Sequence, residues 1–234
     1  MRAQLPRRGG QILPVLLAAI LAAHTGWAQI DDARKQEVEM AFDHYTAAKT
    51  EDQRVAIIDY LQHFESKMVA GALIDHIVDS ENGEQATAYD KLVEGLGPDG
   101  VAAVLDHMAN TDDAVAKGKL VVALRHCQGP DVINALAGCL KDKRAVPFEA
   151  HGPHPRRVCD LAYDELFLKL RTDPRYGLDP SPKMIGIVTE RTPVKARDGL
   201  IAKPRALIAA NPAPTATPPP SPAGSPETGP ATQL

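Results

Sequence analysis

The sequence has few aromatic residues, few cysteines and no familiar catalytic motif. Phe, Trp and Tyr make up 4% of the 234 residues, and runs of β-branched residues are short, so the alternation typical of a β-sheet protein is missing. No Gly-rich phosphate loop, GxSxG or HExxH occurs, although each would be expected in its enzyme class. We therefore expect a protein that is not an enzyme, with no catalytic residues and no cofactor.

The three cysteines, Cys127, Cys139 and Cys159, are an odd number. This excludes a fully paired disulfide framework of the kind that supports small secreted domains. All three fall on the apolar phase of predicted helices, where a thiol behaves as a small apolar side chain. A disulfide between Cys127 and Cys139 stays an open alternative at this point.

Only one long apolar run occurs, and it lies near the N-terminus. Residues 12–23 (ILPVLLAAILAA) follow three arginines and precede Gly26-Trp27-Ala28, which places small residues at the −3 and −1 positions of a cleavage site. This is the layout of a secretory signal peptide, here over residues 1–28. The run is shorter than the roughly 20 residues that cross a bilayer, and an uncleaved membrane anchor is the alternative. We expect an exported protein, periplasmic or secreted.

Charge is distributed unevenly along the chain. The chain carries 26 Lys and Arg against 30 Asp and Glu, a formal net charge of −4. The acidic excess lies over residues 29–140, whereas residues 141–234 are mildly basic. A general nucleic-acid binder would present a basic surface, so this pattern and the export signal argue against a nucleic-acid partner.

Apolar residues recur at steps of three and four from residue 31 to residue 171, which predicts helices. Pro98 and Pro130 suit a first helical turn, where the missing N–H is harmless. Thr111, Asp112 and Asp113 are all good N-cap residue types. The predicted helices cover residues 31–48, 52–64, 68–79, 84–96, 98–110, 112–127, 130–141 and 156–171.

Two apolar templates alternate along these helices, and each places its members on one helix face. The first aligns Phe42, Ile74, Leu105 and Leu136, followed three residues later by Tyr45, Ile77, Met108 and Cys139. The second aligns Ile57, Leu92, Leu120 and Ala162, followed four residues later by Leu61, Leu96, Leu124 and Leu166. A single helical hairpin cannot bury its own apolar face, so the units must stack on one another.

The segments ALIDHIVDS, DDAVAKGKLVVAL and RRVCDLAYDEL resemble HEAT-like repeats, especially the short bacterial type also seen in phycobilisome-lyase-like repeats. The resemblance covers residues 31–171. It implies an all-α fold, an α-solenoid of about four helical hairpins, over the predicted domain at residues 29–171. Tetratricopeptide repeats are the alternative, but their Trp, Gly-Tyr and Pro signature is absent.

The repeat pattern fades after residue 171. Several prolines, among them Pro193 and Pro204, break any long helix, so residues 172–210 are predicted to form an extended, partly ordered segment. Residues 211–234 hold eight prolines and a single charged residue, Glu227. This composition predicts a disordered Pro-rich tail with polyproline character.

An Asp-His pair occurs three times, in FDHY (42–45), IDHI (74–77) and LDHM (105–108). In the second copy Asp75 and His76 lie between two buried positions, so they are predicted to point toward solvent or the flank of the helix. Stacked helices lie about 8–10 Å apart, whereas a metal lies about 2 Å from each ligating nitrogen. Successive histidines therefore cannot share an ion, and we interpret the pair as a feature of repeat ancestry.

The loop at residues 143–157 (KRAVPFEAHGPHPRR) is the most distinctive segment of the chain. Its basic side chains could grip an acidic or phosphate group beside the positive end of the next helix, or pair with the chain's own acidic residues. The candidate partner-binding residues are Lys143, Arg144, His151, His154, Arg156 and Arg157. His151, His154 and Cys159 fall short of the ligands that zinc requires, so no metal site is predicted.

These features predict a monomeric exported scaffold or adaptor that binds a protein or peptide partner of unknown identity. The partner would lie in a groove along the helices of the second template, facing Asp59, Lys91, Glu94, Lys119 and Asp164. Peripheral contact with the cell envelope, through the tail, is a further expectation. The alternative is a ligand- or metal-dependent activity centred on the 143–157 loop, by analogy with lyases that carry similar repeats.

The signal-peptide interpretation predicts that the mature chain begins at Gln29, after cleavage behind Ala28. Intact-mass measurement and N-terminal sequencing of protein from the producing cell's exported fraction check this. Replacing Ala28 by Arg should block cleavage and leave the longer chain on the membrane. Recovery of the full-length chain from the cytosol would contradict the interpretation.

Overall fold

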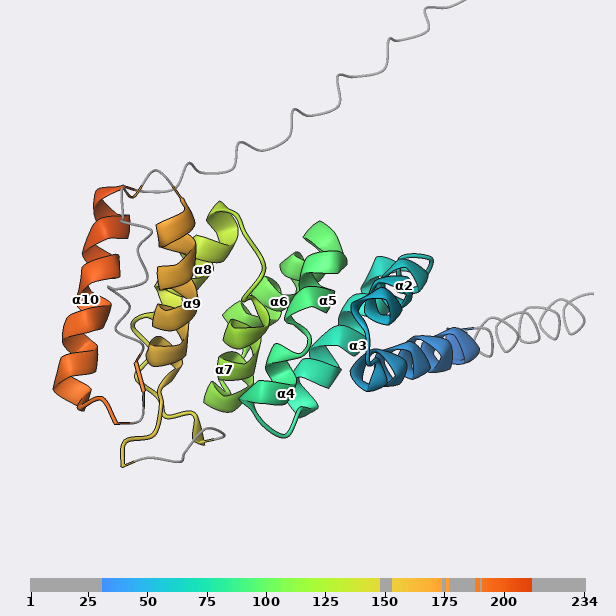
Figure 1. Ribbon diagram of the computed structural model, residues 1–234, viewed down its shortest axis with the longest axis horizontal. Helices are drawn as coiled ribbons and strands as arrows, with labels where there is room; N and C mark the ends of the chain where they lie inside the picture. Colours follow the sequence, from blue (N-terminus) through green and yellow to red (C-terminus); the bar gives the residue numbers. More distant parts are fainter. Residues whose placement is uncertain (1–30, 148–152, 174–175, 177–187, 190, 212–234) are drawn as a thin grey trace, which may run out of the picture.

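The computed structural model describes residues 31–147, 153–173, 176, 188–189 and 191–211 (Figure 1). Within these ranges the fold is all-helical, without a β-strand; one isolated antiparallel bridge joins Ala145 to Arg157. No helix in this part of the chain has the length and apolar content to cross a membrane. The predicted signal peptide lies outside the described residues, as does the predicted tail from residue 212 onward.

A helix over residues 31–47, here called the N-terminal helix, begins the described chain. The helices that follow are α2 (Glu51–Leu61), α3 (Ser66–Asp79), α4 (Gly83–Thr87), α5 (Asp90–Gly95), α6 (Gly97–Asn110), α7 (Ala114–Ala123), α8 (Pro130–Cys139), α9 (Val158–Thr172) and α10 (Val194–Ala210).

Several helices begin at the residues that local chemistry favours. Pro98 and Pro130 lie in the first turns of α6 and α8, as predicted. The Asp113 carboxylate accepts a hydrogen bond from the Val115 N–H at 2.8 Å and caps α7, which satisfies one orphan amide. Gly129, with φ +119°, precedes α8, a conformation that a residue with a Cβ rarely adopts.

The prediction of one helix over residues 84–96 is wrong, because a turn at Ala88 and Tyr89 divides it into α4 and α5. The turn points Tyr89 into the interior, where 5% of the residue is exposed. Its ring centroid lies 6.4 Å from those of both Phe42 and Tyr45 on the N-terminal helix. Packing of this aromatic group outweighs continuation of the helix.

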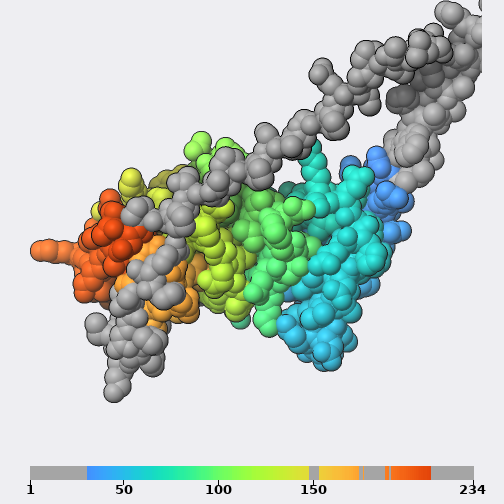
Figure 2. All heavy atoms as spheres, turned by 90° about the horizontal axis from the view of Figure 1, so that it is seen from above, coloured from blue at the N-terminus to red at the C-terminus, as the bar shows by residue number. Residues whose placement is uncertain are grey.

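Helices that follow one another in sequence also follow one another along the long axis of the molecule. Figures 1 and 2, turned by 90°, both show the colours running in order from the N-terminal helix at one end to α10 at the other. α3 packs against α6 and α7, α7 packs against α9, and α9 also packs against α8 and α10. Each of these helices therefore packs its apolar face against several others, and the buried side chains form one core cluster.

Both apolar templates line this core. Most members are buried, while Leu105, Ile57 and Leu96 are partly buried and pack against the same cluster. The buried members of the two templates are Phe42, Tyr45, Leu61, Ile74, Ile77, Leu92, Met108, Leu120, Leu124, Leu136, Cys139, Ala162 and Leu166.

The expectation of an extended segment up to residue 210 is wrong over residues 194–210, which form α10 with Pro204 inside it. A proline in a helix interior removes one hydrogen bond and costs about 3 kcal/mol. Here Arg197, Ile201 and Pro204 form the buried stripe of the helix, which packs against α9. Tertiary contacts on that stripe offset the local cost.

Two buried lysines bind the carbonyl ends of other helices. Lys169 of α9 donates from Nζ to the carbonyls of Leu124, Arg125 and Cys127 at 2.9, 2.9 and 2.7 Å, just beyond α7. Lys119 of α7 does the same at the end of α3, with the Val78 carbonyl at 2.5 Å and the Ser80 carbonyl. A cation at a helix C-terminus satisfies orphan carbonyls and complements the helix dipole.

Replacing Lys169 by Met should lower the free energy of unfolding by about 1–3 kcal/mol, because buried carbonyls lose their donor. Urea denaturation followed by circular dichroism measures the change. Lys203→Met, an exposed position on α10, is the matched control and should leave stability nearly unchanged. Equal effects of the two substitutions would show that the capping contact contributes nothing.

Candidate functional site

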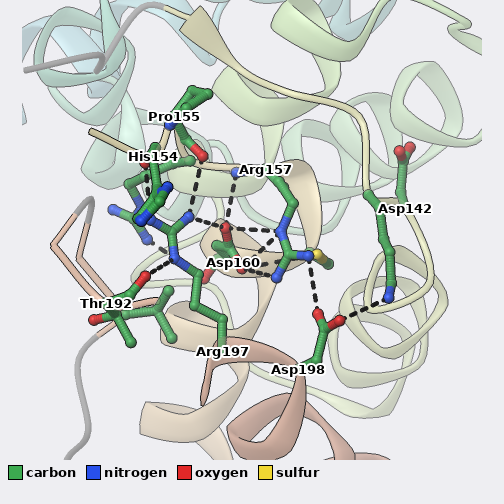
Figure 3. Close-up of polar contacts among 12 residues, drawn as sticks. Asp142, His154, Pro155, Arg157, Asp160, Thr192, Arg197 and Asp198 are labelled. Atoms are coloured by element: carbon green, nitrogen blue, oxygen red, sulfur yellow. Dashed lines mark hydrogen bonds and ion pairs between the residues drawn. The ribbon is translucent and has the colours of Figure 1, made fainter. Parts of the chain in front are cut away.

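We call the loop at residues 143–157 the basic loop. Its described residues and α10 form a cluster of ion pairs centred on Asp160 of α9 (Figure 3). Asp160 is fully buried, and its carboxylate accepts hydrogen bonds from Arg157 Nη2 at 2.8 Å and from Arg197 Nη1 at 2.8 Å. The Arg157 backbone N–H donates to the same carboxylate at 3.0 Å. These hydrogen bonds offset the free-energy cost of removing the charged carboxylate from water.

Arg197 ties α10 to the end of the loop. It is fully buried and donates to the carbonyls of His154 at 2.8 Å, Pro155 at 3.0 Å and Thr192 at 2.7 Å. The next residue, Asp198, accepts from Arg157 Nη1 at 2.9 Å. The planar guanidinium can serve several acceptors at once, so one side chain joins two stretches of backbone, residues 154–155 and residue 192.

The remaining basic side chains of the loop are also paired within the chain. Lys143 donates to Asp198 at 2.9 Å, and Arg144 Nη2 donates to Asp142 at 2.5 Å. Arg156 pairs with Asp164. Neighbouring positive charge lowers the pKa of Asp142 and of Asp198, in each case first through the hydrogen bond from the basic side chain.

This arrangement favours the second of the two interpretations of the loop, namely pairing with the chain's own acidic residues. His151 lies outside the described residues, and His154 contributes its carbonyl to Arg197. Within the described ranges, no three His, Cys, Asp or Glu side chains come together as a metal would need. The sequence offered one signal for the pairing: Asp160 stands three residues after Arg157.

All three cysteines are free and buried, so the open disulfide between Cys127 and Cys139 is not formed. Burial raises the pKa of Cys127 and Cys139 to about 11 and that of Cys159 to about 12. These thiols are therefore uncharged at neutral pH and act as apolar core residues.

A cleft of about 770 Å³ lies between the N-terminal helix, α3 and the α4–α5 turn. We call it the acidic cleft. Its lining residues are Glu39, Thr46, Asp75, His76, Asp79, Ser80, Gln85, Ala88 and Tyr89. Three carboxylates face it, while none of these lining residues is Lys or Arg, so its electrostatic potential favours a cation.

His76 lies at the wall of this cleft and not in open solvent. Its ring stacks on Phe42 with centroids 4.8 Å apart and planes 6° apart. Nε2 donates to Glu39 Oε2 at 2.8 Å, and Nδ1 lies 3.4 Å from the Tyr89 hydroxyl. Asp75 is exposed, as predicted, whereas His76 is partly buried at the flank of α3 because its ring stacks on Phe42 of the N-terminal helix.

The other Asp-His copies behave differently. Asp43, His44 and Asp106 are exposed and His107 is partly buried. None of these four side chains lines the acidic cleft, to which the second copy contributes Asp75 and His76. Burial, and secondarily the charge of Asp43, raises the pKa of Tyr89, so this hydroxyl stays protonated at neutral pH.

The side chains expected to face a partner along the second template differ in their exposure. Asp59 and Glu94 are exposed, but Lys119 is buried at the end of α3, and the expectation that it faces a partner is wrong. Lys91 donates to Glu51 at 2.9 Å, and Asp164 pairs with Arg156. These side chains serve contacts within the fold.

Comparison with protein-family models, with curated proteins and with solved structures finds no match.

The environment of Asp164 predicts an unusual dependence of stability on pH. Burial raises its pKa to about 6, partly opposed by Arg156. A carboxyl group has a pKa of about 3.9 in the unfolded chain, so between about pH 4 and pH 6 the folded state binds more protons. The free energy of unfolding should therefore fall as pH rises through this range.

Urea denaturation at pH 4, 5, 6 and 7 tests this prediction. Asp164→Asn should flatten the decline, whereas Asp59→Asn, at an exposed carboxylate on α2, should preserve it. Identical slopes for the wild type and Asp164→Asn would contradict the shifted pKa.

Proposed function

We propose that this protein is an exported scaffold or adaptor with a HEAT-like α-solenoid, and that its acidic cleft binds a basic segment of a protein partner. The cleft is the observation that carries the proposal. It combines a volume of about 770 Å³ with three facing carboxylates, Glu39, Asp75 and Asp79. Pockets of roughly 300–1,000 Å³ are typical of binding sites.

The arrangement of the helices supports the solenoid part of the proposal. Apolar templates repeat along the sequence, and the helices that carry them are ordered along the long axis in Figure 1. The helices α7 and α9 each contact helices before and after them in the chain: α7 packs against α3 and α9, and α9 packs against α8 and α10. In stacked repeats every unit contacts only nearby units, and surfaces between units become binding surfaces.

The walls of the acidic cleft are held in place before any partner binds. Glu39 is fixed by its hydrogen bond to His76, which in turn stacks on Phe42. Ser80 Oγ donates to the Ile77 carbonyl at 2.6 Å, and Lys119 holds the backbone beneath. A preorganised site loses less conformational entropy on binding. A Lys or Arg side chain of the partner would reach Asp75 and Asp79 from solvent.

The alternative activity centred on the 143–157 loop has less support. Its described cations are already bound to Asp142, Asp160, Asp164 and Asp198, so recruiting a ligand there would break existing ion pairs. Export and the envelope contact of the tail remain parts of the proposal that depend on the sequence alone.

Site-directed cross-linking in the producing cell tests the partner site. A photo-reactive residue at Thr46, exposed at the cleft, should yield a discrete adduct, while one at Ala209 on α10 should not. Asp75→Lys/Asp79→Lys should abolish the adduct, because the reversed charges repel a basic segment.

Asp59→Lys/Asp106→Lys is the matched control, since it makes the same charge change at exposed positions that do not line the acidic cleft. It should leave the adduct intact. An adduct that survives reversal in the cleft, or that is lost equally in the control, would refute binding of a basic segment at this site.

A further inference from the structure

Glu165 of α9 is a buried carboxylate with an unmatched oxygen. The residue is 3% exposed. Its Oε1 accepts hydrogen bonds from Arg125 Nε at 3.2 Å and Arg125 Nη2 at 3.0 Å, whereas Oε2 has no donor within the described part of the chain. Buried polar atoms nearly always have a partner, and an unmatched one is costly.

This carboxylate lines a pocket of about 290 Å³, which we call the α9 pocket. One wall is apolar: the rings of Tyr163 and Phe167 stack with centroids 5.8 Å apart, and Leu168 at the same pocket is 45% exposed. The α9 pocket thus joins an apolar surface to a carboxylate that has one oxygen without a donor, and apolar walls with a few polar groups are typical of small-molecule sites.

The other charged groups of the α9 pocket balance one another. Arg125 is bound to Glu165, and Arg156 is bound to Asp164. The second oxygen of Asp164 accepts from the Val188 N–H at 3.3 Å. Two guanidinium groups therefore face two carboxylates. A ligand with a net charge would bring an unpaired charge into a partly buried pocket, which is costly.

We propose that the α9 pocket binds a small neutral apolar molecule that carries a hydroxyl group, with the hydroxyl donating to Glu165 Oε2. A hydroxyl group supplies the hydrogen-bond donor that Glu165 Oε2 lacks. It brings no carbonyl oxygen, which would need a hydrogen-bond donor from the protein in turn. An O–H donor to an ionised carboxylate makes a short and strong hydrogen bond. The apolar part of the ligand lies against Phe167 and Leu168. The α9 pocket shares no lining residue with the acidic cleft.

Titration with 2-phenylethanol, followed by chemical shifts of the backbone amides in nitrogen-15-labelled protein, tests this inference. Shifts should saturate and centre on Phe167 and Leu168. The methyl ether of the same molecule has the same ring but no donor, and it should bind at least tenfold more weakly. Phenethylammonium, which adds a charge, should also bind more weakly than the alcohol.

Glu165→Gln should weaken binding of the alcohol roughly tenfold, because the hydrogen bond loses its charged acceptor. Glu94→Gln, an exposed glutamate on α5, is the matched control. Asp75→Lys/Asp79→Lys should bind the alcohol normally, which separates this site from the acidic cleft. Equal affinity for the alcohol and its ether would overturn the inference even if Glu165→Gln fails to fold, as would shifts centred elsewhere.

Discussion

Burial of apolar helix faces between neighbouring helices is the interaction on which this structure depends. Aromatic residues are scarce, so the core consists largely of Leu, Ile, Val and Ala from helices adjacent in sequence. Each fully buried side chain of Leu or Ile size contributes roughly 1.5–3 kcal/mol. The helices α7 and α9 each pack against helices that precede them and helices that follow them in the chain.

This mode of packing leaves helix ends inside the molecule, and buried charges satisfy them. Lys119 and Lys169 bind carbonyls at the ends of α3 and α7. Asp160 and Arg197 connect the basic loop to α10 at the far end of the array. Removing one partner of a buried ion pair such as Asp160–Arg197 costs about 3–5 kcal/mol, so this pair holds α10 against α9. Burial lowers the pKa of Lys169 because removal from water disfavours its positive charge. Its three hydrogen bonds offset this desolvation cost.

The same packing creates the two hollows on which the proposals rest. The acidic cleft forms where the N-terminal helix, α3 and the α4–α5 turn meet, and its histidine is held by Phe42 and Glu39. The α9 pocket forms where the end of α7 meets α9, and it contains the unmatched oxygen of Glu165. The basic loop, in contrast, is used internally to hold α10.

The sequence by itself determined the helical class, most of the buried positions and several helix starts. Periodicity identified residues such as Phe42, Leu124 and Leu166 as core. Side chains three or four residues apart lie on the same face of a helix, whatever surrounds it. Local chemistry likewise determined the first turns at Pro98 and Pro130.

Only the tertiary structure decided the rest. The break at Tyr89, the helix through Pro204, the stacking of His76 and the pairing of Arg157 with Asp198 all depend on residues distant in sequence. Local propensity is a weak preference of about 1 kcal/mol or less for most residues, so contacts between distant segments readily override it. Both candidate sites are made of such contacts, which is why their residues show no motif.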